Sequence, residues 1–439
     1  MSEEQVEGKN RHKMHAHPVV YILVALFGSA SWLSTNSVWL ELSLLTQKLP
    51  EGWSLPSYLA LIVQIACIGP LIYTLILKGA KVNLPTPPLV FGLLVMCTVA
   101  EFCLAFFWDV TVEVFGKSHS VALFVLMFLM ALVNSTSNVL FMPYMATFHP
   151  SYLTAYFVGM GFSSLYPSVV SLLQGTSSYE CSYDLSKNSS YPVFSSPRFH
   201  IQAYTLLMAS WMAMTLIAFS LLHFCHDYFA NLGKDQDDFT DGPRESSPLK
   251  SQEETISRPT TEESTGRSAL SRFVILSFCL AFICAQMNAV VPSVQSYATM
   301  SYSQLTYHLA LALSSLAHPV ASFLPMWIQP KGLKDLVGVT VAGTAGCTAI
   351  FVLALQSPKP WGVGTVYGPV FSVLVSIFTA LLHAYGRTIL TSVIREDAPH
   401  NESRLFWCGV FMQVGSFIGS LIMFPIVNVA GLFESAPLC

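Results

Sequence analysis

The sequence predicts an all-α protein whose helices span a membrane, and three observations support this fold class. Hydrophobic residues make up 53% of the 439 positions and charged residues only 10%, far below the about 25% of soluble domains. The apolar residues gather in runs of roughly 20, the length of a spanning helix. One extended polar stretch separates two groups of these runs. So few charges cannot cover a water-facing surface, and we therefore expect lipid to surround most of the molecule.

Eleven apolar runs are long enough to cross the bilayer, six before the polar stretch and five after it. They cover residues 18–42, 57–77, 88–108, 120–142, 152–174, 200–224, 272–291, 303–327, 336–356, 364–386 and 405–430. The first run has no small-residue cleavage site after it, so we expect a spanning helix and not a cleaved signal peptide. The predicted fold is a polytopic membrane protein with eleven transmembrane helices in a six-plus-five arrangement.

The polar stretch, residues 231–271, is rich in Asp, Glu, Ser, Thr and Pro and has too little apolar surface to fold. We therefore assign residues 226–271 to a disordered cytoplasmic linker. It joins a six-helix bundle, residues 18–225, to a five-helix bundle, residues 272–430. The predicted ends of the chain are a cytoplasmic N-terminal tail, residues 1–17, and a short extracellular tail, residues 431–439.

Charges in the short loops predict the orientation, because cytoplasmic loops carry an excess of Lys and Arg. With the N-terminus inside, the inner loops hold Lys78, Lys81, Lys331, Lys334, Arg387, Arg395 and Arg404. This orientation places the sequon Asn188-Ser189-Ser190 outside, so we expect Asn188 to be glycosylated. Asn401 also begins a sequon but falls on the inner side, and we expect it to stay unmodified.

Several classes of function lack their sequence signals. The net charge is −4 and no Lys/Arg-rich run exists, which argues against a nucleic-acid partner. The ten cysteines are scattered singly without a CxxC pair, so no metal or redox site is expected. The chain has no zinc-protease, serine-hydrolase or Walker motif. We therefore expect no enzyme, no cofactor and no ATP-driven step, and a substrate must move down its own gradient or with a coupled ion.

The two groups of runs show a faint internal repeat. Tyr58 and Pro70 in the second run correspond to Tyr307 and Pro319 in the eighth at a constant offset of 249. Parallel halves joined by a cytoplasmic linker are one architecture of secondary transporters. The repeat and the linker favour a two-bundle, alternating-access design. This design resembles the major facilitator and equilibrative nucleoside transporter classes, with the last helix of the second half missing.

Polar side chains inside the apolar runs mark a candidate substrate path, because an ionised group at the bilayer centre costs at least about 2.5–3.5 kcal/mol. Trp32, Asn36 and Trp39 are spaced four and three residues apart, which places them on one helical face. For Trp32 and Asn36 we favour a cavity role, whereas Trp39 fits an interfacial aromatic belt equally well. Glu41 lies near the predicted outer end, where it is either solvated or part of a mouth or gate.

Other runs add further candidates. Asn138 in the fourth run either contacts substrate or makes the interhelical hydrogen bond that is common in membranes. His308 is either a satisfied neutral histidine, the more frequent case, or a proton sensor. Glu101 and His383 are also intramembrane, and for both we favour structural pairing. The remaining candidates are Tyr166, which precedes a proline, and Asn288 and Gln295 in and after the seventh run.

A specific motif follows the first run, Leu49-Pro-Glu-Gly-Trp-Ser-Leu-Pro-Ser-Tyr58. Together with Trp32, Asn36 and Trp39-Leu-Glu41, it closely resembles the signature of the eukaryotic riboflavin transporter family. The resemblance runs from the first run to the last. Its further matches are Ser137-Asn138-Val139, Gln174-Gly175, Glu180-Cys181, Asn288, Pro292, Val294-Gln295-Ser296, Tyr302, Tyr307-His308, Gln413-Val-Gly-Ser416, Gly419 and Met423-Phe-Pro425.

The resemblance implies a riboflavin carrier of the plasma membrane with eleven helices and a cytosolic linker after the sixth. Riboflavin is a flat, uncharged tricyclic ring with amide-like edges and a polyhydroxyl tail. Aromatic side chains can stack on such a ring for about 0.5–1.5 kcal/mol each, and Asn and Gln can both donate to and accept from its edges. The main binding candidates are Trp32, Asn36, Asn138, Asn288 and Gln295, and the secondary ones are Trp39, Glu41, Tyr166 and His308.

The resemblance also bears on the C-terminus, which is short here and ends in a single cysteine, Cys439. A pairing of Cys439 with Cys181 would be the counterpart of a tail disulfide in relatives. Two other functions stay open. An equilibrative nucleoside carrier also has eleven helices and a heteroaromatic substrate, and competition by uridine would identify it. A surface receptor or scaffold would add no uptake of any solute.

Overall fold

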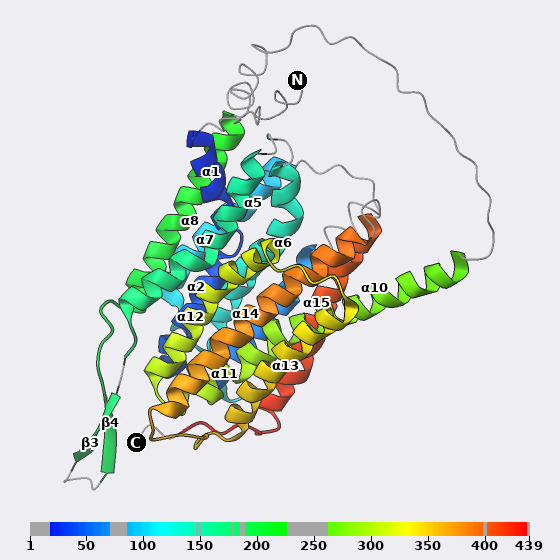
Figure 1. Cartoon of the computed structure of the whole chain (residues 1–439). Coiled ribbons are helices and arrows are strands. Elements are labelled where there is room, and N and C mark those ends of the chain that lie inside the picture. Colours follow the sequence, from blue (N-terminus) through cyan, green and yellow to red (C-terminus); the bar gives the residue numbers. More distant parts are fainter. Residues whose placement is uncertain are drawn as a thin grey trace, which may run out of the picture.

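The computed structural model describes residues 18–70, 86–145, 148, 151–177, 179–184, 189–225, 262–397 and 402–436. Most of the predicted linker, both sequon asparagines (Asn188 and Asn401) and Cys439 lie outside these residues. Within them the chain is helical apart from two short antiparallel hairpins (Figure 1). The predicted all-α membrane class is therefore confirmed.

The first half contains seven described helices and both hairpins. The helices are α1 (Pro18–Ser29), α2 (Leu33–Lys48), α3 (Leu55–Ala66), α5 (Thr86–Phe107), α6 (Val121–Met145), α7 (Ser151–Gln174) and α8 (Ile201–Phe224), and a short 3-10 helix η1 (Gly52–Ser54) precedes α3. Strands β1 (Val112–Val114) and β2 (Lys117–His119) form one hairpin, and β3 (Tyr179–Asp184) and β4 (Ser189–Phe194) form the other.

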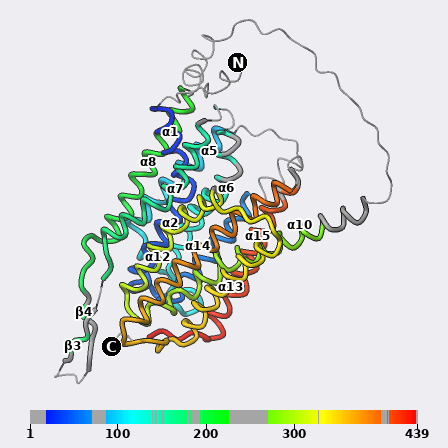
Figure 2. Tube along the Cα trace, viewed as in Figure 1, coloured from blue at the N-terminus to red at the C-terminus, as the bar shows by residue number. Residues whose placement is uncertain are grey.

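The second half begins with one long, irregular helix. It consists of α10 (Glu262–Ala285), the π-helical segment η2 (Gln286–Val290) and α11 (Val291–Met300). The later elements are α12 (Gln304–Phe323), the 3-10 helix η3 (Leu324–Met326), α13 (Leu333–Leu355), α14 (Tyr367–Glu396) and α15 (Glu402–Asn428). In Figure 2 the blue-to-green first half and the light-green-to-red second half lie beside each other.

Length and hydropathy identify eight spanning helices among the described residues, or nine if α1 and α2 are counted as one bent span. The predicted run 18–42 is broken at residues 30–32, where the axis bends by 54°, and the helical chain continues to Lys48. The count of eleven and the six-plus-five split stay predictions.

Residues 262–271, which the sequence assigned to the linker, are helical and form the start of α10. The sequence placed the first helix of the second half from residue 272 because these residues are polar, and the division into two bundles and a linker stays a prediction. No proline interrupts the chain between Glu262 and Pro292, so a helix can begin here.

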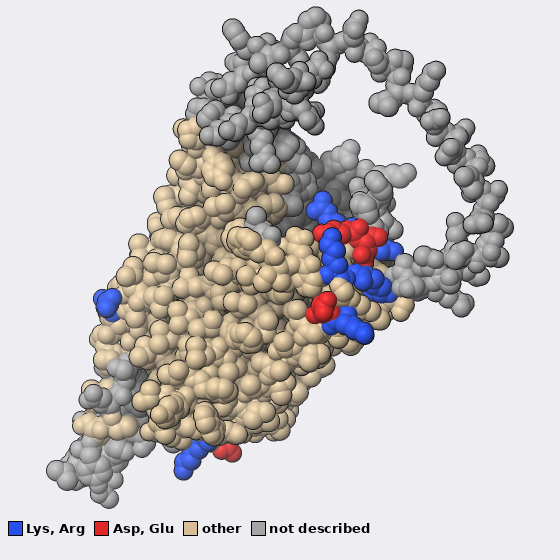
Figure 3. Space-filling view, viewed as in Figure 1, with Lys and Arg blue, Asp and Glu red and all other residues tan. Residues whose placement is uncertain are grey.

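The surface has the character expected of a protein in lipid. Large apolar side chains such as Phe102, Phe106, Phe278 and Phe378 are exposed, while many Ser, Thr and other polar residues are buried. Figure 3 shows that most charged side chains in that view gather near one end of α10 and α14, above a broad uncharged band. Ion pairs at this end join Arg272 to Asp397 (2.7 Å) and Lys331 to Glu396 (3.2 Å).

Helices of the two halves pack in corresponding pairs. Helix α3 packs on α15 and α11, and α12 packs on α7 and α2. Helices α2, α3 and α7 of the first half correspond to α11, α12 and α15 of the second half. The contact of α3 with α15 then corresponds to that of α12 with α7, and the contact of α3 with α11 corresponds to that of α12 with α2. The sequence repeat had already matched α3 with α12 through Tyr58 and Tyr307, so the packing agrees with it.

The ends of the bundle differ in what they carry. Helix α1 begins and α8 ends at one end, whereas β3, β4 and the C-terminal residues lie at the opposite end (Figure 1). The ring of Phe433 in the C-terminal segment packs against Tyr297 at the end of α11, with centroids 5.3 Å apart. We call this opposite end the hairpin end.

Candidate functional site

The predicted stripe on α2 is half-exposed on a helix that is otherwise mostly buried. Trp32, Asn36 and Trp39 are partly accessible, whereas the residues between them are buried. Asn36 donates through Nδ2 to the backbone oxygen of Ser163 on α7 (3.2 Å). Trp32 stands directly at the break between α1 and α2. The partly exposed residues are therefore the three that their spacing placed on one helical face.

The corresponding helix of the second half presents Asn288 from the π-helical segment. Its Nδ2 donates to Ser416 Oγ on α15 (2.9 Å), and the side chain is half-exposed. π-Helical bulges often occur at functional sites because they re-aim side chains. The neighbouring Gln286 instead lies in a buried chain of hydrogen bonds with Thr344 and His383, both at 3.0 Å. His383 therefore has a hydrogen-bond partner within the second half, and its structural role stays a prediction.

Two other candidates from the first half lie on α7 and α6. The ring of Tyr166 stacks on Trp211 of α8, with centroids 4.1 Å apart and an interplanar angle of 25°. Trp211 is itself fixed by donating to Ser29 Oγ (2.9 Å). The side chain of Asn138 lies outside the described atoms, although its helix α6 is described.

His308 and Gln295 lie where the two halves meet. His308 Nδ1 and Ser43 Oγ of α2 share a hydrogen bond of 3.2 Å, and Gln304 Nε2 donates to the Ser43 backbone oxygen. Gln295 is only 6% exposed. Its Nε2 and the Nε2 of His308 are buried and have no hydrogen-bond partner among the described atoms. Buried polar atoms are usually paired, so these two nitrogens are suited to a polar ligand or water.

Further contacts join the halves at the hairpin end. Ser296 Oγ donates to the backbone oxygen of Trp53 (2.6 Å), whose ring lies edge-on to Tyr297. Asn428 Nδ2 donates to Ser57 Oγ (2.8 Å). We call these contacts, together with those of Ser43, the seam.

Within the Leu49–Tyr58 motif, Glu51 also accepts from the backbone N–H and hydroxyl of Ser120 (2.8 and 2.7 Å) and so caps the start of α6. The motif was visible in the sequence, but the partners of the seam were not.

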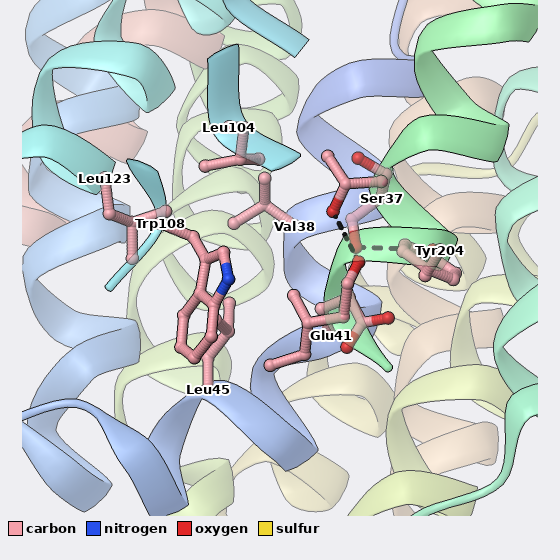
Figure 4. Close-up of a pocket in the computed structure, with 10 residues that line it drawn as sticks. Ser37, Val38, Glu41, Leu45, Leu104, Trp108, Leu123 and Tyr204 are labelled. Carbon is pink, nitrogen blue, oxygen red and sulfur yellow. Dashed lines mark hydrogen bonds between the residues drawn. The ribbon is translucent and has the colours of Figure 1, made fainter. Parts of the chain in front are cut away.

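Glu41 lies deeper than the sequence suggested, because α2 continues to Lys48. It is 3% exposed and points away from the stripe into a small cavity of about 10 Å³ inside the first half. Figure 4 shows Ser37 and Tyr204 on one side of this cavity and Leu104, Trp108 and Leu123 on the other. The side chain of Gln174 on α7 lies within hydrogen-bonding reach of the Glu41 carboxylate, and Lys48 at the end of α2 is the nearest positive charge.

Glu101 of α5 contacts Ser37, a residue of the cavity lining, and was treated in the sequence as a structural residue. It is fully buried, and its Oε1 accepts from Ser37 Oγ (3.0 Å). Ser37 also lines the cavity one helical turn before Glu41. The sequence missed this arrangement, because α5 and α2 meet only in the folded bundle.

The chain matches the family model described as solute carrier family 52, riboflavin transporter, over residues 16–435. Riboflavin transporter rft-1 of Caenorhabditis elegans is 44% identical over 429 residues, covering 95% of this chain and 98% of that protein. Solute carrier family 52, riboflavin transporter, member 3 of Homo sapiens is 34% identical, covering 96% of this chain and 98% of that protein.

Solved structures show the same architecture at low sequence identity. A D-xylose–proton symporter matches with a TM-score of 0.56 at 14% identity, covering 94% of this chain and 90% of that chain. A point mutant of the nucleoside transporter NupG gives 0.53 at 12% identity, covering 94% and 91%. These likenesses support the predicted transporter fold. From the family model and the relatives together, the chain belongs to solute carrier family 52, the riboflavin transporters.

Proposed function

We propose that this chain carries riboflavin into the cell across the plasma membrane by alternating access, without ATP hydrolysis. The observation that carries the proposal is the family match over residues 16–435, with 44% identity to a curated riboflavin transporter along 98% of its length. The fold of two helical groups with corresponding packing pairs supports a carrier mechanism.

The binding site is proposed to lie between the halves. Trp32 and Asn36 of α2 and Asn288 of η2 support this placement, because they are half-exposed residues of the two corresponding irregular spans. Gln295 and His308 offer buried, unpaired nitrogens close to the seam. The heteroaromatic ring of riboflavin can stack on Trp32, and its polar edges can form hydrogen bonds with these groups. Roles of Asn138, Trp39, Tyr166 and Glu41 in substrate binding stay predictions.

We propose that the hairpin end faces outside and that the N-terminus lies in the cytoplasm. Cys181 on β3 is disulfide-bonded, while the eight other described cysteines are free. Disulfides persist in oxidising compartments, so the bond supports an extracellular hairpin end. The seam joins the halves at this end, and the described arrangement would therefore be closed to the outside. Eleven spans divided six and five are part of the same proposal.

Uptake of labelled riboflavin by cells expressing the chain, compared with mock-transfected cells, tests the function. We expect added uptake that unlabelled flavins suppress and uridine does not. Suppression by uridine alone would indicate the nucleoside carrier instead. A chain that reaches the surface without adding uptake of either solute would be a receptor or scaffold, and the proposal would be wrong.

A further inference from the structure

A groove of about 590 Å³ lies on the surface of the second half, between α13 and α14. On the α13 side it is lined by Ala345 and Ala349, which are too small to fill it. Trp361, in the connection between the two helices, and Phe371 of α14 form a wall, with ring centroids 5.6 Å apart. Pockets that hold small molecules have volumes of roughly 300–1,000 Å³. The groove is therefore large enough for a ligand.

The groove opens toward lipid. Helices α13 and α14 are both long and apolar enough to span the membrane, and α13 packs on α10, α11 and α14 of the second half. Figures 1 and 3 show α13 and α14 on a largely uncharged face. Within the groove, Thr348 and Val352 are exposed, and the Thr348 hydroxyl is already bonded to the Thr344 backbone oxygen (2.8 Å). The body of the groove therefore suits an apolar occupant.

Polar groups gather where the groove ends, in the turn that follows α13. Gln356 lines the groove and accepts the Trp361 backbone N–H through Oε1 (2.9 Å), while its Nε2 donates to no described atom. Lys359 belongs to the same turn, because its backbone N–H donates to the Gln356 backbone oxygen (2.9 Å). Lys359 is exposed and forms no ion pair with a described acid. Tryptophan is enriched at the headgroup level of membranes, so Trp361 indicates that these donors lie at that level.

These donors favour one class of lipid. A lysine ammonium and an amide N–H both bond to an anionic oxygen, and such charge-assisted hydrogen bonds are the stronger ones. A phospholipid carries a phosphate at the headgroup level and acyl chains beneath it, so one molecule can occupy the donors and the apolar groove together. A sterol or a diacylglycerol can also fill an apolar groove, but neither offers a negative charge to Lys359.

We propose that the groove is a binding site for one phospholipid of the leaflet at the hairpin end. One acyl chain lies against Ala345 and Ala349, and the phosphate accepts from the Lys359 ammonium and the Gln356 amide. The site is separate from the proposed riboflavin site between the halves. The inference goes beyond the proposed function, because it does not depend on which solute the chain carries.

The position of the groove gives the lipid a structural effect. Leu353 lines the groove and is buried in a cluster with Tyr297 and Phe433. The Tyr297 ring lies edge-on to Trp53 of the first half, with centroids 5.8 Å apart. An acyl chain packed on Leu353 therefore supports the cluster through which the second half meets the seam. We expect the bound phospholipid to raise the melting temperature of the purified protein.

Native mass spectrometry of the purified, delipidated chain tests the site by counting bound lipids. Palmitoyl-oleoyl phosphatidylcholine is compared with palmitoyl-oleoyl glycerol, which has the same chains without the phosphate. We expect one phosphatidylcholine to bind about five-fold more tightly than the glycerol lipid, the contribution of one basic residue near a membrane surface. Lys359→Gln should remove most of this preference. Lys117→Gln changes an exposed lysine of β2 at the same end and should keep it.

Ala345→Leu tests the groove itself, because the larger side chain fills it. The affinity for phosphatidylcholine should fall about ten-fold, the effect of displacing roughly two methylene groups from apolar contact. Ala342→Leu adds the same bulk to an exposed alanine of α13 outside the groove and should bind like the native chain. Equal melting of the two lipid-free variants checks that both fold. Phosphatidylcholine should then raise the melting temperature of Ala342→Leu but not of Ala345→Leu.

Any of three results would overturn the inference. Equal binding of the two lipids by the native chain would show that the phosphate is not recognised. Equal affinity of Ala345→Leu and Ala342→Leu for phosphatidylcholine would show that the lipid binds elsewhere on the surface. Displacement of the bound phosphatidylcholine by a lower concentration of cholesterol would assign the groove to a sterol instead. These measurements contain no riboflavin, so their failure leaves the proposed function standing and is distinguishable from its failure.

Discussion

At the residue scale, Asn36 combines a structural bond with free binding capacity. An Asn side chain has two N–H donors and an acceptor oxygen, and the bond to the Ser163 backbone oxygen uses one donor. The remaining donor and the oxygen can bind the polar edge of a substrate. The half-exposed position between Trp32 and Trp39 puts these groups beside two aromatic faces.

We predict that Asn36→Ala raises the half-saturating riboflavin concentration while surface expression stays near normal. An unpaired group in a desolvated site costs about 1–3 kcal/mol, which corresponds to roughly 5- to 150-fold weaker binding. Initial rates of labelled uptake over a concentration series measure the change. Trp32→Phe should be milder than Trp32→Ala, because Phe keeps a stacking face. Normal affinity of Asn36→Ala would show that the stripe only packs.

Glu51 has a different role, because both of its oxygens are used within the first half. They accept from the Ser120 backbone N–H and hydroxyl and thereby satisfy the first turn of α6. Glu51→Gln should lower the stability of the purified protein by about 1–3 kcal/mol, the cost of weakening charged hydrogen bonds. Thermal unfolding measured by size-exclusion chromatography detects this loss. Glu113→Gln is the matched control, and equal melting of both variants would contradict the capping role.

At the element scale, periodicity explains what the sequence could predict. The spacing of Trp32, Asn36 and Trp39 is local, so one helical face could be assigned before any fold was known. The seam could not be assigned in this way. Ser296 and Trp53 are 243 positions apart, and Ser43 and His308 are 265 apart. Glu41 illustrates the same limit, because its depth depends on where α2 ends and on α5 and α8 packing around it.

We predict that the hydrogen bonds of the seam hold the hairpin end closed. Ser296→Ala with Asn428→Ala removes two hydrogen bonds between the halves, each worth about 0.5–1.5 kcal/mol. The population of molecules open at the hairpin end should therefore rise by roughly 5- to 150-fold. Hydrogen–deuterium exchange should increase in peptides that contain Trp53 and Tyr297. Thr348→Ala is a suitable control, because its hydroxyl bonds only within α13. Unchanged exchange in the double variant would show that these bonds do not hold the seam closed.

At the scale of the whole molecule, the packing gives the faint repeat a physical meaning. A shared offset between Tyr58 and Tyr307 is weak by itself, since apolar helices often match by chance. The contacts of α3 with α15 and of α12 with α7 show that the matched helices occupy corresponding places between the halves. The irregular first span of each half, bent at residues 30–32 and π-helical at η2, strengthens this correspondence. Corresponding halves that meet along such helices can rock about a site between them.

The orientation of this assembly is open to a direct test through glycosylation. The hairpin end carries the disulfide-bonded Cys181, and the ion pairs of Arg272 and Lys331 lie at the opposite end. Our proposal puts the hairpin end outside, and both the positive-inside rule and the disulfide support it. Asn188, which lies between β3 and β4 in the sequence, should then carry a glycan. Glycosidase treatment of the protein from a eukaryotic cell should lower its apparent mass, and Asn188→Gln should remove that shift. Asn401→Gln serves as the comparison and should leave the shift unchanged. A shift that survives Asn188→Gln and disappears with Asn401→Gln would place the hairpin end in the cytoplasm and reverse the direction in which the seam closes.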